Sequence, residues 1–232
     1  MLSSADISSP GKQERIQEGV VETQVSRAHT AYLVLEGKIV TLELRPGSSI
    51  TEKQLIELVG LGRTPVREAI QRLSWEGLIE VVPRSGVKIA DIRPEDYSRV
   101  MEPRVALEPL LARKAARFAD AMHRARLAEC ADSMMAAAKA RDMAGFLQAD
   151  KDFDETLDRA CENPFLTKVL APLQTHARRF WVRFSAEGGP EASAMRHVKV
   201  MKAIQVQDEE AAGLAMAELM DYLSSIAASL MR

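Results

Sequence analysis

A change in composition near residue 93 constrains the fold of this 232-residue chain more than any other feature. Residues 25–92 contain β-branched residues, glycines and turn signals, whereas residues 94–232 are rich in Ala, Leu, Met and Arg. This difference predicts a mixed domain at 25–92 and a helical domain at 93–232. Residues 1–24 are rich in Ser, Gly and charged residues, which predicts a flexible arm.

The bulk composition is that of an ordinary globular protein, with 47% hydrophobic and 28% charged residues. Cys130 and Cys161 are far apart in helix-like segments, so we expect small buried side chains and no disulfide. No run of 18 apolar residues and no secretory signal occurs, which favours a cytoplasmic protein without a membrane span. The net charge of −2 argues weakly against nucleic acid binding, but the position of the basic residues matters more.

Residues 25–92 divide into short elements with clear boundaries. Thr51 and Gln54 form a capping-box pattern, Thr64 and Pro65 are typical of a helix start, and Gly77 of a helix end. The expected elements are helices at 25–40, 52–59 and 65–76, and strands at 78–82 and 87–90. Three helices followed by a β-hairpin predict a winged helix-turn-helix, so the fold class is mainly α, with this domain joined to an all-α bundle of six or seven helices.

The third helix carries basic residues at the end that would enter a DNA major groove. Arg63 and Arg67 are four residues apart, share one helical face, and have the fork geometry that recognises guanine. Thr64 can donate to a phosphate, and the hairpin would form a small basic wing. The predicted DNA-contacting residues are Arg63, Thr64, Pro65 and Arg67 in this helix, Lys53 in the second helix, and Arg84, Gly86 and Lys88 in the wing.

The sequence resembles the GntR family of bacterial transcriptional regulators. Residues 44–55 resemble the family's turn into its second helix, residues 62–73 its recognition helix, and residues 76–86 its wing. Residues 104–109, 150–163 and 197–208 resemble the FCD effector domain of the FadR-type subgroup. The resemblance implies a homodimer, a palindromic operator on double-stranded DNA, and a helical bundle that holds a small-molecule effector, often a carboxylate.

Many FCD domains bind a divalent metal ion through one Asp and three His side chains, and this chain matches that pattern only in part. Asp150 and His197 are present, but Asp154 and Leu219 stand where histidines are expected. The predicted effector-binding residues are Arg104, Asp150, Asp154, Arg178 and His197, with Arg104 as a bidentate clamp for an acid. Pro103 is expected to kink the helix at 95–118 or to delay its start, which would shift Arg104.

Three interpretations of this cluster remain open. Asp150, Asp154 and His197 could hold a divalent ion that prefers oxygen ligands. Alternatively, the site has lost its metal and binds the effector directly, or it is vestigial. Two buried carboxylates four residues apart would raise each other's pKa, which indicates a nearby cation such as Arg104, Arg178 or Arg183.

The leading functional hypothesis is a ligand-responsive transcriptional regulator, more often a repressor in this family. The first alternative is a metal-dependent enzyme that uses Asp150, Asp154 and His197, although no nucleophile–base pair and no phosphate-binding loop is visible. The second is a helical interaction module whose winged domain binds protein. Neither alternative explains the arginines at the tip of the third helix.

Overall fold

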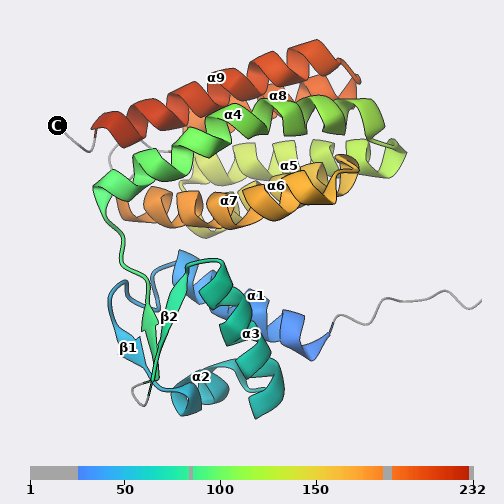
Figure 1. Ribbon diagram of the computed structural model, residues 1–232. Coiled ribbons are helices and arrows are strands. Elements are labelled where there is room, and N and C mark those ends of the chain that lie inside the picture. Colours follow the sequence, from blue (N-terminus) through green and yellow to red (C-terminus); the bar gives the residue numbers. More distant parts are fainter. Residues whose placement is uncertain (1–25, 84–85, 185–189, 230–232) are drawn as a thin grey trace, which may run out of the picture.

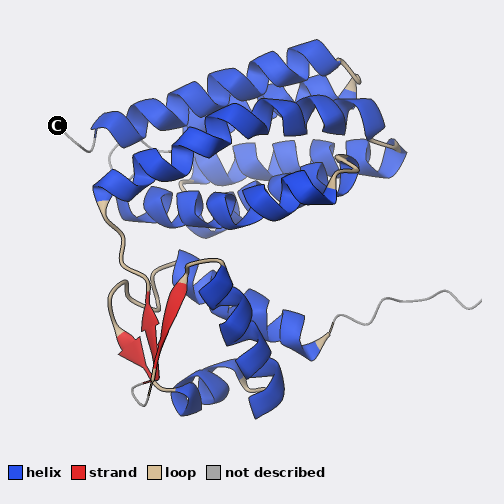
Figure 2. Cartoon of the chain, in the orientation of Figure 1, coloured by secondary structure: helices blue, strands red, loops and turns tan. Residues whose placement is uncertain are grey.

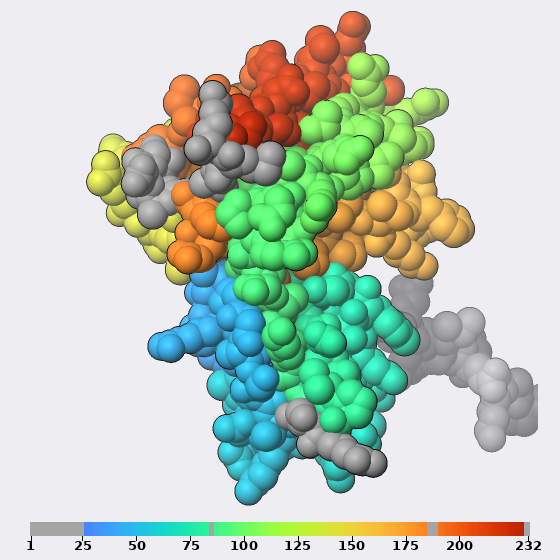
Figure 3. All heavy atoms as spheres, turned by 60° about the vertical axis from the view of Figure 1, so that its left-hand side comes forward, coloured from blue at the N-terminus to red at the C-terminus, as the bar shows by residue number. Residues whose placement is uncertain are grey.

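The computed structural model describes residues 26–83, 86–184 and 190–229. Within them the chain forms nine helices and three strands, arranged as a small mixed domain and a larger helical bundle (Figures 1 and 2). The predicted arm at residues 1–24 and the predicted wing residue Arg84 lie outside the described residues. The two domains pack directly against each other when all heavy atoms are drawn (Figure 3).

The three helices of the small domain are α1 (Arg27–Val40), α2 (Glu52–Val59) and α3 (Arg63–Trp75). Ser26 caps α1 by accepting a hydrogen bond from the backbone N–H of His29. The predicted capping box of α2 is confirmed, because Thr51 and Gln54 each accept from the other's backbone N–H. Gly60 ends α2 in the left-handed conformation. Local sequence signals therefore determine where α1 and α2 begin and where α2 ends.

The wing is a three-stranded antiparallel sheet rather than a simple hairpin. Strands β2 (Ile79–Val82) and β3 (Gly86–Ile89) form the predicted hairpin, and β1 (Ser49–Ile50) pairs with the other edge of β3. In this register Val87 and Ile89 are buried, whereas Lys88 is exposed on the opposite face. The sheet therefore closes one side of the apolar core of the small domain, which also receives side chains from all three helices.

Gly86 occupies a position that other residues cannot adopt without strain. Its φ is +102°, and an added Cβ would lie 2.6 Å from the backbone oxygen of Ile50. We expect Gly86→Ala to lower the free energy of unfolding by about 2 kcal/mol or more, because both the backbone and β1 must shift. Urea unfolding checks this. Gly37→Ala, where nothing lies within 4 Å of the added Cβ, is the matched control and should not destabilise the protein. Equal stabilities of Gly86→Ala and the parent would contradict the expectation.

The larger domain is a bundle whose described helices agree with the predicted all-α architecture. Their bounds are α4 (Pro94–Phe118), α5 (Ala121–Ala140), α6 (Met143–Ala160), α7 (Pro164–Phe184), α8 (Glu191–Gln205) and α9 (Glu209–Ser229). In Figure 1, α6 and α7 lie on the side of the bundle that faces the small domain, and α7 packs against α1. None of the described helices has the length and apolarity that a membrane crossing requires.

The expectation that Pro103 would delay the start of α4 is wrong. The helix begins at Pro94, where a proline is favoured because the first helical N–H needs no partner, and it continues through Pro103 and Pro109. Burial of Met101, Leu111 and other residues of α4 against the bundle offsets the hydrogen bonds that the two prolines remove. Arg104 is consequently held on a continuous helix and points into the interior, where it is buried.

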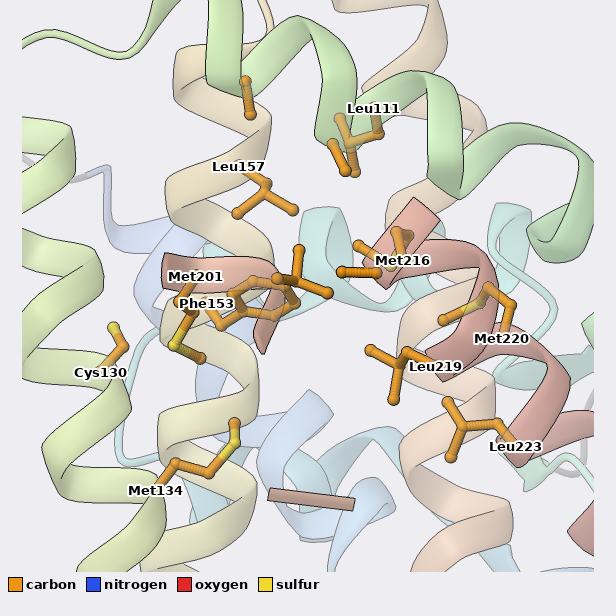
Figure 4. Close-up of a cluster of buried hydrophobic side chains, with 14 of the residues drawn as sticks. Leu111, Cys130, Met134, Phe153, Leu157, Met201, Met216, Leu219, Met220 and Leu223 are labelled. Carbon is orange, nitrogen blue, oxygen red and sulfur yellow. The ribbon is translucent and has the colours of Figure 1, made fainter. Parts of the chain in front are cut away.

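The interior of the bundle is built from Leu, Met, Ala and Phe side chains (Figure 4). Leu219 is fully buried in this cluster, next to Met216, Met220 and Leu223 of the same helix. It occupies the position where the family pattern would have a histidine, and it contributes packing there. The apolar core thus extends up to the predicted effector site.

Candidate DNA interface and effector pocket

The recognition helix begins two residues earlier than the sequence predicted, at Arg63 and not at Pro65. Gly62 is the N-cap and has extended backbone angles, so Thr64 is the second helical residue and not the cap. Pro65 is therefore the third residue, where its missing N–H costs no hydrogen bond because the first turn has no intrahelical acceptors. The Thr64 hydroxyl therefore does not cap the helix, and Thr64 is exposed at the tip of α3.

Arg63 and Arg67 are brought together by a residue that the sequence analysis missed. The Nε atoms of Arg63 and Arg67 lie 2.8 and 3.2 Å from the two carboxylate oxygens of Glu52, the first residue of α2. The arginine side chains remain 73% and 63% exposed. Glu52 thus aligns two accessible guanidinium groups on one face of α3. In the sequence, Glu52 is recognisable only as an acidic residue in the first turn of a helix. Such residues are too common to predict this contact with α3.

The remaining predicted DNA contacts are divided between two faces. Thr64, Arg67 and Gly86 line one groove between α3 and the wing. Lys53 is highly exposed at the start of α2, with its ammonium 3.8 Å from Glu57. Lys88 lies on the other face of the sheet, in a groove lined also by Asp96 of α4. The structure therefore groups the residues of α3 with Gly86 and places Lys88 apart from them.

The bundle contains a small polar cavity next to its apolar core. Arg104, Asp150, Arg178 and His197, which come from four different helices, all line this cavity. The other lining residues, which the sequence analysis missed, are Tyr97, Phe146, Leu147, Gln174, Ala177, Trp181, Ser193 and Leu223. Its volume of about 30 Å³ has room for about two water molecules, so in this conformation it accepts a compact polar group.

Arg178 is the cation at the centre of this cluster. Its Nη1 lies 2.6 Å from Oδ2 of Asp154 and 3.4 Å from Oδ2 of Asp150. All three side chains are at least four-fifths buried. The prediction that a cation accompanies the two carboxylates is therefore matched by Arg178 and not by Arg183, which is exposed and lies over the ring of Phe184.

His197 is fixed on both sides of its ring. Its Nε2 lies 3.1 Å from Oδ1 of Asp150, and its Nδ1 lies 2.9 Å from the backbone oxygen of Ser193. The rings of Phe146 and Phe153 lie nearly perpendicular to the imidazole, at centroid distances of 6.4 and 5.4 Å. Both imidazole nitrogens are thus engaged with oxygen atoms of the protein.

The two aspartates of this cluster differ in their acidity. Burial opposes ionisation of Asp150, but the hydrogen bond and charge of His197, together with Arg178 and Arg104, lower its pKa to about 2. The pKa of Asp154 is instead raised, because burial and the negative charge of Asp150 outweigh the attraction of Arg178. Asp150 is therefore the more acidic of the two carboxyl groups.

Arg104 is the second buried cation of the cavity. Its Nε donates to Oε1 of Glu108 at 2.9 Å, and the same oxygen accepts from Nε2 of Gln174 at 3.3 Å. The spacing of four residues between Arg104 and Glu108 could have indicated this pair from the sequence. Glu108 is fully buried, so this ion pair fixes the position of the Arg104 guanidinium and offsets its positive charge.

The side chains present do not fit the divalent metal ion that the family pattern implies. The guanidinium of Arg178 contacts both carboxylates that would be ligands, and His197 has no free nitrogen. Leu219 supplies no donor atom. Among the described residues, no three His, Cys, Asp or Glu side chains gather in a way that could hold a metal ion.

Comparison with known proteins agrees with both domains. Residues 27–89 match the model of bacterial regulatory proteins of the gntR family, and residues 99–222 match the FCD domain. An uncharacterized HTH-type transcriptional regulator of Agrobacterium vitis is 32% identical over 58% of this chain and 81% of its own length. The HTH-type transcriptional repressor RspR of Escherichia coli is 24% identical over 88% of this chain and 92% of its own.

Solved structures show the same fold. The E. coli protein McbR/YncC superposes with a TM-score of 0.77 at 20% identity, covering 90% of this chain and all of the other. A GntR regulator from Rhodococcus gives a TM-score of 0.65 at 21% identity over 86% of this chain and 97% of its own.

A winged helix-turn-helix with exposed arginines at the tip of its recognition helix, joined to a helical domain with a buried polar cavity, defines a ligand-responsive DNA-binding transcriptional regulator. More specifically, the chain belongs to the GntR family and carries an FCD effector domain. The alternative of a metal-dependent enzyme is not supported, because the domains and the relatives are those of regulators.

Proposed function

We propose that this regulator is a homodimeric cytoplasmic repressor that binds a palindromic operator and releases it on binding a small organic acid. The main support for DNA binding is the pair of exposed guanidinium groups of Arg63 and Arg67, which Glu52 holds side by side. A two-fold dimer presents two such pairs, and this favours a palindromic site with half-sites separated by whole helical turns. The relative RspR, named a repressor, supports this direction of control.

The cavity favours an anionic effector. Arg104 and Arg178 are both buried and both line the space next to Asp150 and His197. Guanidinium groups in a site of low dielectric bind carboxylates with two parallel hydrogen bonds. Because the cavity admits only a compact group, the effector would be a small acid whose few carbon atoms contact the rings of Tyr97, Phe146 and Trp181.

A gel-shift assay with the full chain and the DNA that flanks its own gene tests this proposal. We expect a discrete complex that survives an excess of unrelated competitor DNA at physiological salt. Because non-specific binding is electrostatic, the competitor removes it and leaves the specific complex. A folded dimer that gives no complex under these conditions would contradict the proposal.

We also propose that the effector site works without a metal ion, with Arg178 supplying the positive charge. The full-length protein, purified with and without EDTA, should contain far less than one metal ion per chain by elemental analysis. Its melting temperature should not change on addition of EDTA, Mn²⁺ or Ni²⁺, because metal binding would otherwise stabilise the folded state. One tightly bound ion per chain, with a lower melting temperature after chelation, would contradict this and favour the metal-binding interpretation.

A further inference from the structure

Arg178 connects the effector cavity to the surface where the two domains meet. It lines the small cavity with Arg104 and His197, and it also lines a second cavity of about 240 Å³ between the domains. The second cavity is bordered by Tyr32, Glu36 and Arg72 of the winged domain. Arg178 and Gln174 both line the two spaces, and the Arg178 guanidinium contacts Asp150 on one side and Thr175 on the other.

A continuous chain of hydrogen bonds leads from this guanidinium into the winged domain. While Nη1 of Arg178 holds Asp154, Nη2 donates to Oγ1 of Thr175 at 3.2 Å. Oγ1 of Thr175 in turn lies 2.9 Å from Oε1 of Glu36, a residue of α1. Glu36 is only 4% exposed, and Lys151 of α6 neutralises its other oxygen.

The threonine hydroxyl has two possible acceptors for its single proton. Besides Glu36, the backbone oxygen of Ala171 lies 3.2 Å from Oγ1, within the same helix. When Arg178 donates to Oγ1, it polarises the hydroxyl and strengthens the bond that the hydroxyl donates to the Glu36 carboxylate. If the Arg178 guanidinium no longer donates to Oγ1, the hydroxyl can donate to the backbone oxygen of Ala171 instead. The hydrogen bond between Thr175 and Glu36, which joins the two domains, is then lost. Thr175 can therefore donate its proton to either acceptor, and the bond from Arg178 favours the Glu36 carboxylate.

The other side chains of α7 that reach the winged domain do not line the effector cavity. His176 contacts the backbone oxygen of Glu76 at 2.9 Å, and Arg179 donates to the backbone oxygen of Ala90 at 2.7 Å. Arg178 lines the small cavity and donates to Thr175, and Thr175 bonds Glu36 of the winged domain. Among the described residues that line this cavity, no other has such a two-step connection to the winged domain. The route through Thr175 is therefore specific to this cavity.

We infer that Thr175 is the positioning residue that couples the effector site to the DNA-binding domain, by sharing its hydroxyl between Arg178 and Glu36. An anion that enters the cavity competes for the Arg178 guanidinium, weakens its bond to Thr175 and loosens α1 from α7. Because α1 packs on the recognition helix, this changes how firmly the winged domain is held. The inference rests on the proposed function, for which it supplies the mode of regulation.

Hydrogen–deuterium exchange of the full-length protein tests this coupling without DNA or effector. Thr175→Val keeps the shape and removes the hydroxyl, and we expect roughly tenfold faster exchange of the α1 amides near Glu36. Arg178→Lys keeps a positive charge on the aspartates, but its single ammonium cannot also hold Thr175, so it should have a similar effect. The double variant should exchange no faster than either single variant, because both break the same chain.

Thr156→Val is the matched control, since Thr156 is equally buried in α6 and its hydroxyl bonds groups of the bundle, the backbone oxygen of Asp152 and the thiol of Cys130. It should leave α1 unchanged. If Thr175→Val does not fold, Glu36→Gln weakens the same bond from the other domain. Unchanged exchange in α1, or additive effects of the two variants, would overturn the inference.

The same variants separate this inference from the proposed function. In the gel-shift assay, Arg178→Lys should change DNA affinity in the parent background and have no further effect in the Thr175→Val background. If the parent protein binds no DNA, the proposed function fails, whereas the exchange result stands alone. If DNA binds and Arg178→Lys acts equally in both backgrounds, the coupling fails and the function stands.

Discussion

Alanine at Arg63 or Arg67 should weaken binding to the operator by about 1–3 kcal/mol for each arginine, and alanine at both should abolish a detectable specific complex. Each guanidinium is exposed and free to leave Glu52 for a guanine edge, whereas alanine offers the base no donor. Neither arginine is part of the apolar core, so the fold should remain intact. Fluorescence anisotropy at one fixed salt concentration measures the change.

Arg99→Ala provides the matched control for this prediction. Arg99 is similarly exposed and ion-paired, but it lies on α4 with Asp96 as its partner. Losing this charge should change operator affinity little, because the arginine lies on α4 and not at the tip of α3. If Arg99→Ala weakened binding as much as Arg67→Ala, the binding would depend on overall charge and the recognition role of α3 would be contradicted.

Arg178→Ala should be among the most destabilising single substitutions in the effector domain. It leaves Asp150 and Asp154 buried next to each other without their cation, and removing one member of a buried ion pair costs about 3–5 kcal/mol. For a chain of this size such a loss lowers the melting temperature by about 6–20 °C. Calorimetry of the full-length protein measures this shift.

Arg183→Ala is the control on the same helix. Arg183 is exposed and outside the cavity, so its loss should change the stability by no more than about 0.5 kcal/mol. Replacing Asp154 with Asn in the Arg178→Ala background should recover part of the lost stability, because it removes the carboxyl group that Arg178 contacts most closely, whereas Asp150 keeps its contact with His197. Equal melting temperatures for Arg178→Ala and Arg183→Ala would show that Arg178 is not the cation that holds the cluster together.

The winged domain could be predicted from the sequence because its boundaries depend on local signals. The capping box at Thr51 and Gln54 correctly predicted α2. The two-residue strand β1 was missed because Ser49 and Ile50 are too few to show a strand period. Thr64 was misread as a cap because Thr-Pro is typical of a helix start, whereas Gly62 can take the same extended conformation without a side-chain bond.

The effector cluster could be predicted in its members but not in its pairings. Resemblance to the family and spacing selected Arg104, Asp150, Arg178 and His197, which the fold brings to one cavity. The pairing of cations with carboxylates depends on how four helices pack against one another. The spacing of these residues along the sequence does not predict that packing. The contact between Glu36 and Thr175 joins residues 139 positions apart in two domains, and so the link between the domains was not visible in the sequence.

A hydroxyl-radical footprint on the DNA flanking the chain's own gene tests the central claim most directly. The full-length protein should protect two patches related by two-fold symmetry, with centres separated by about 34 Å of helix axis or a whole multiple of it. A variant with alanine at both Arg63 and Arg67 should protect neither patch. A folded dimer that leaves the flanking DNA unprotected, or protects a single asymmetric patch that persists in this double variant, would contradict the account.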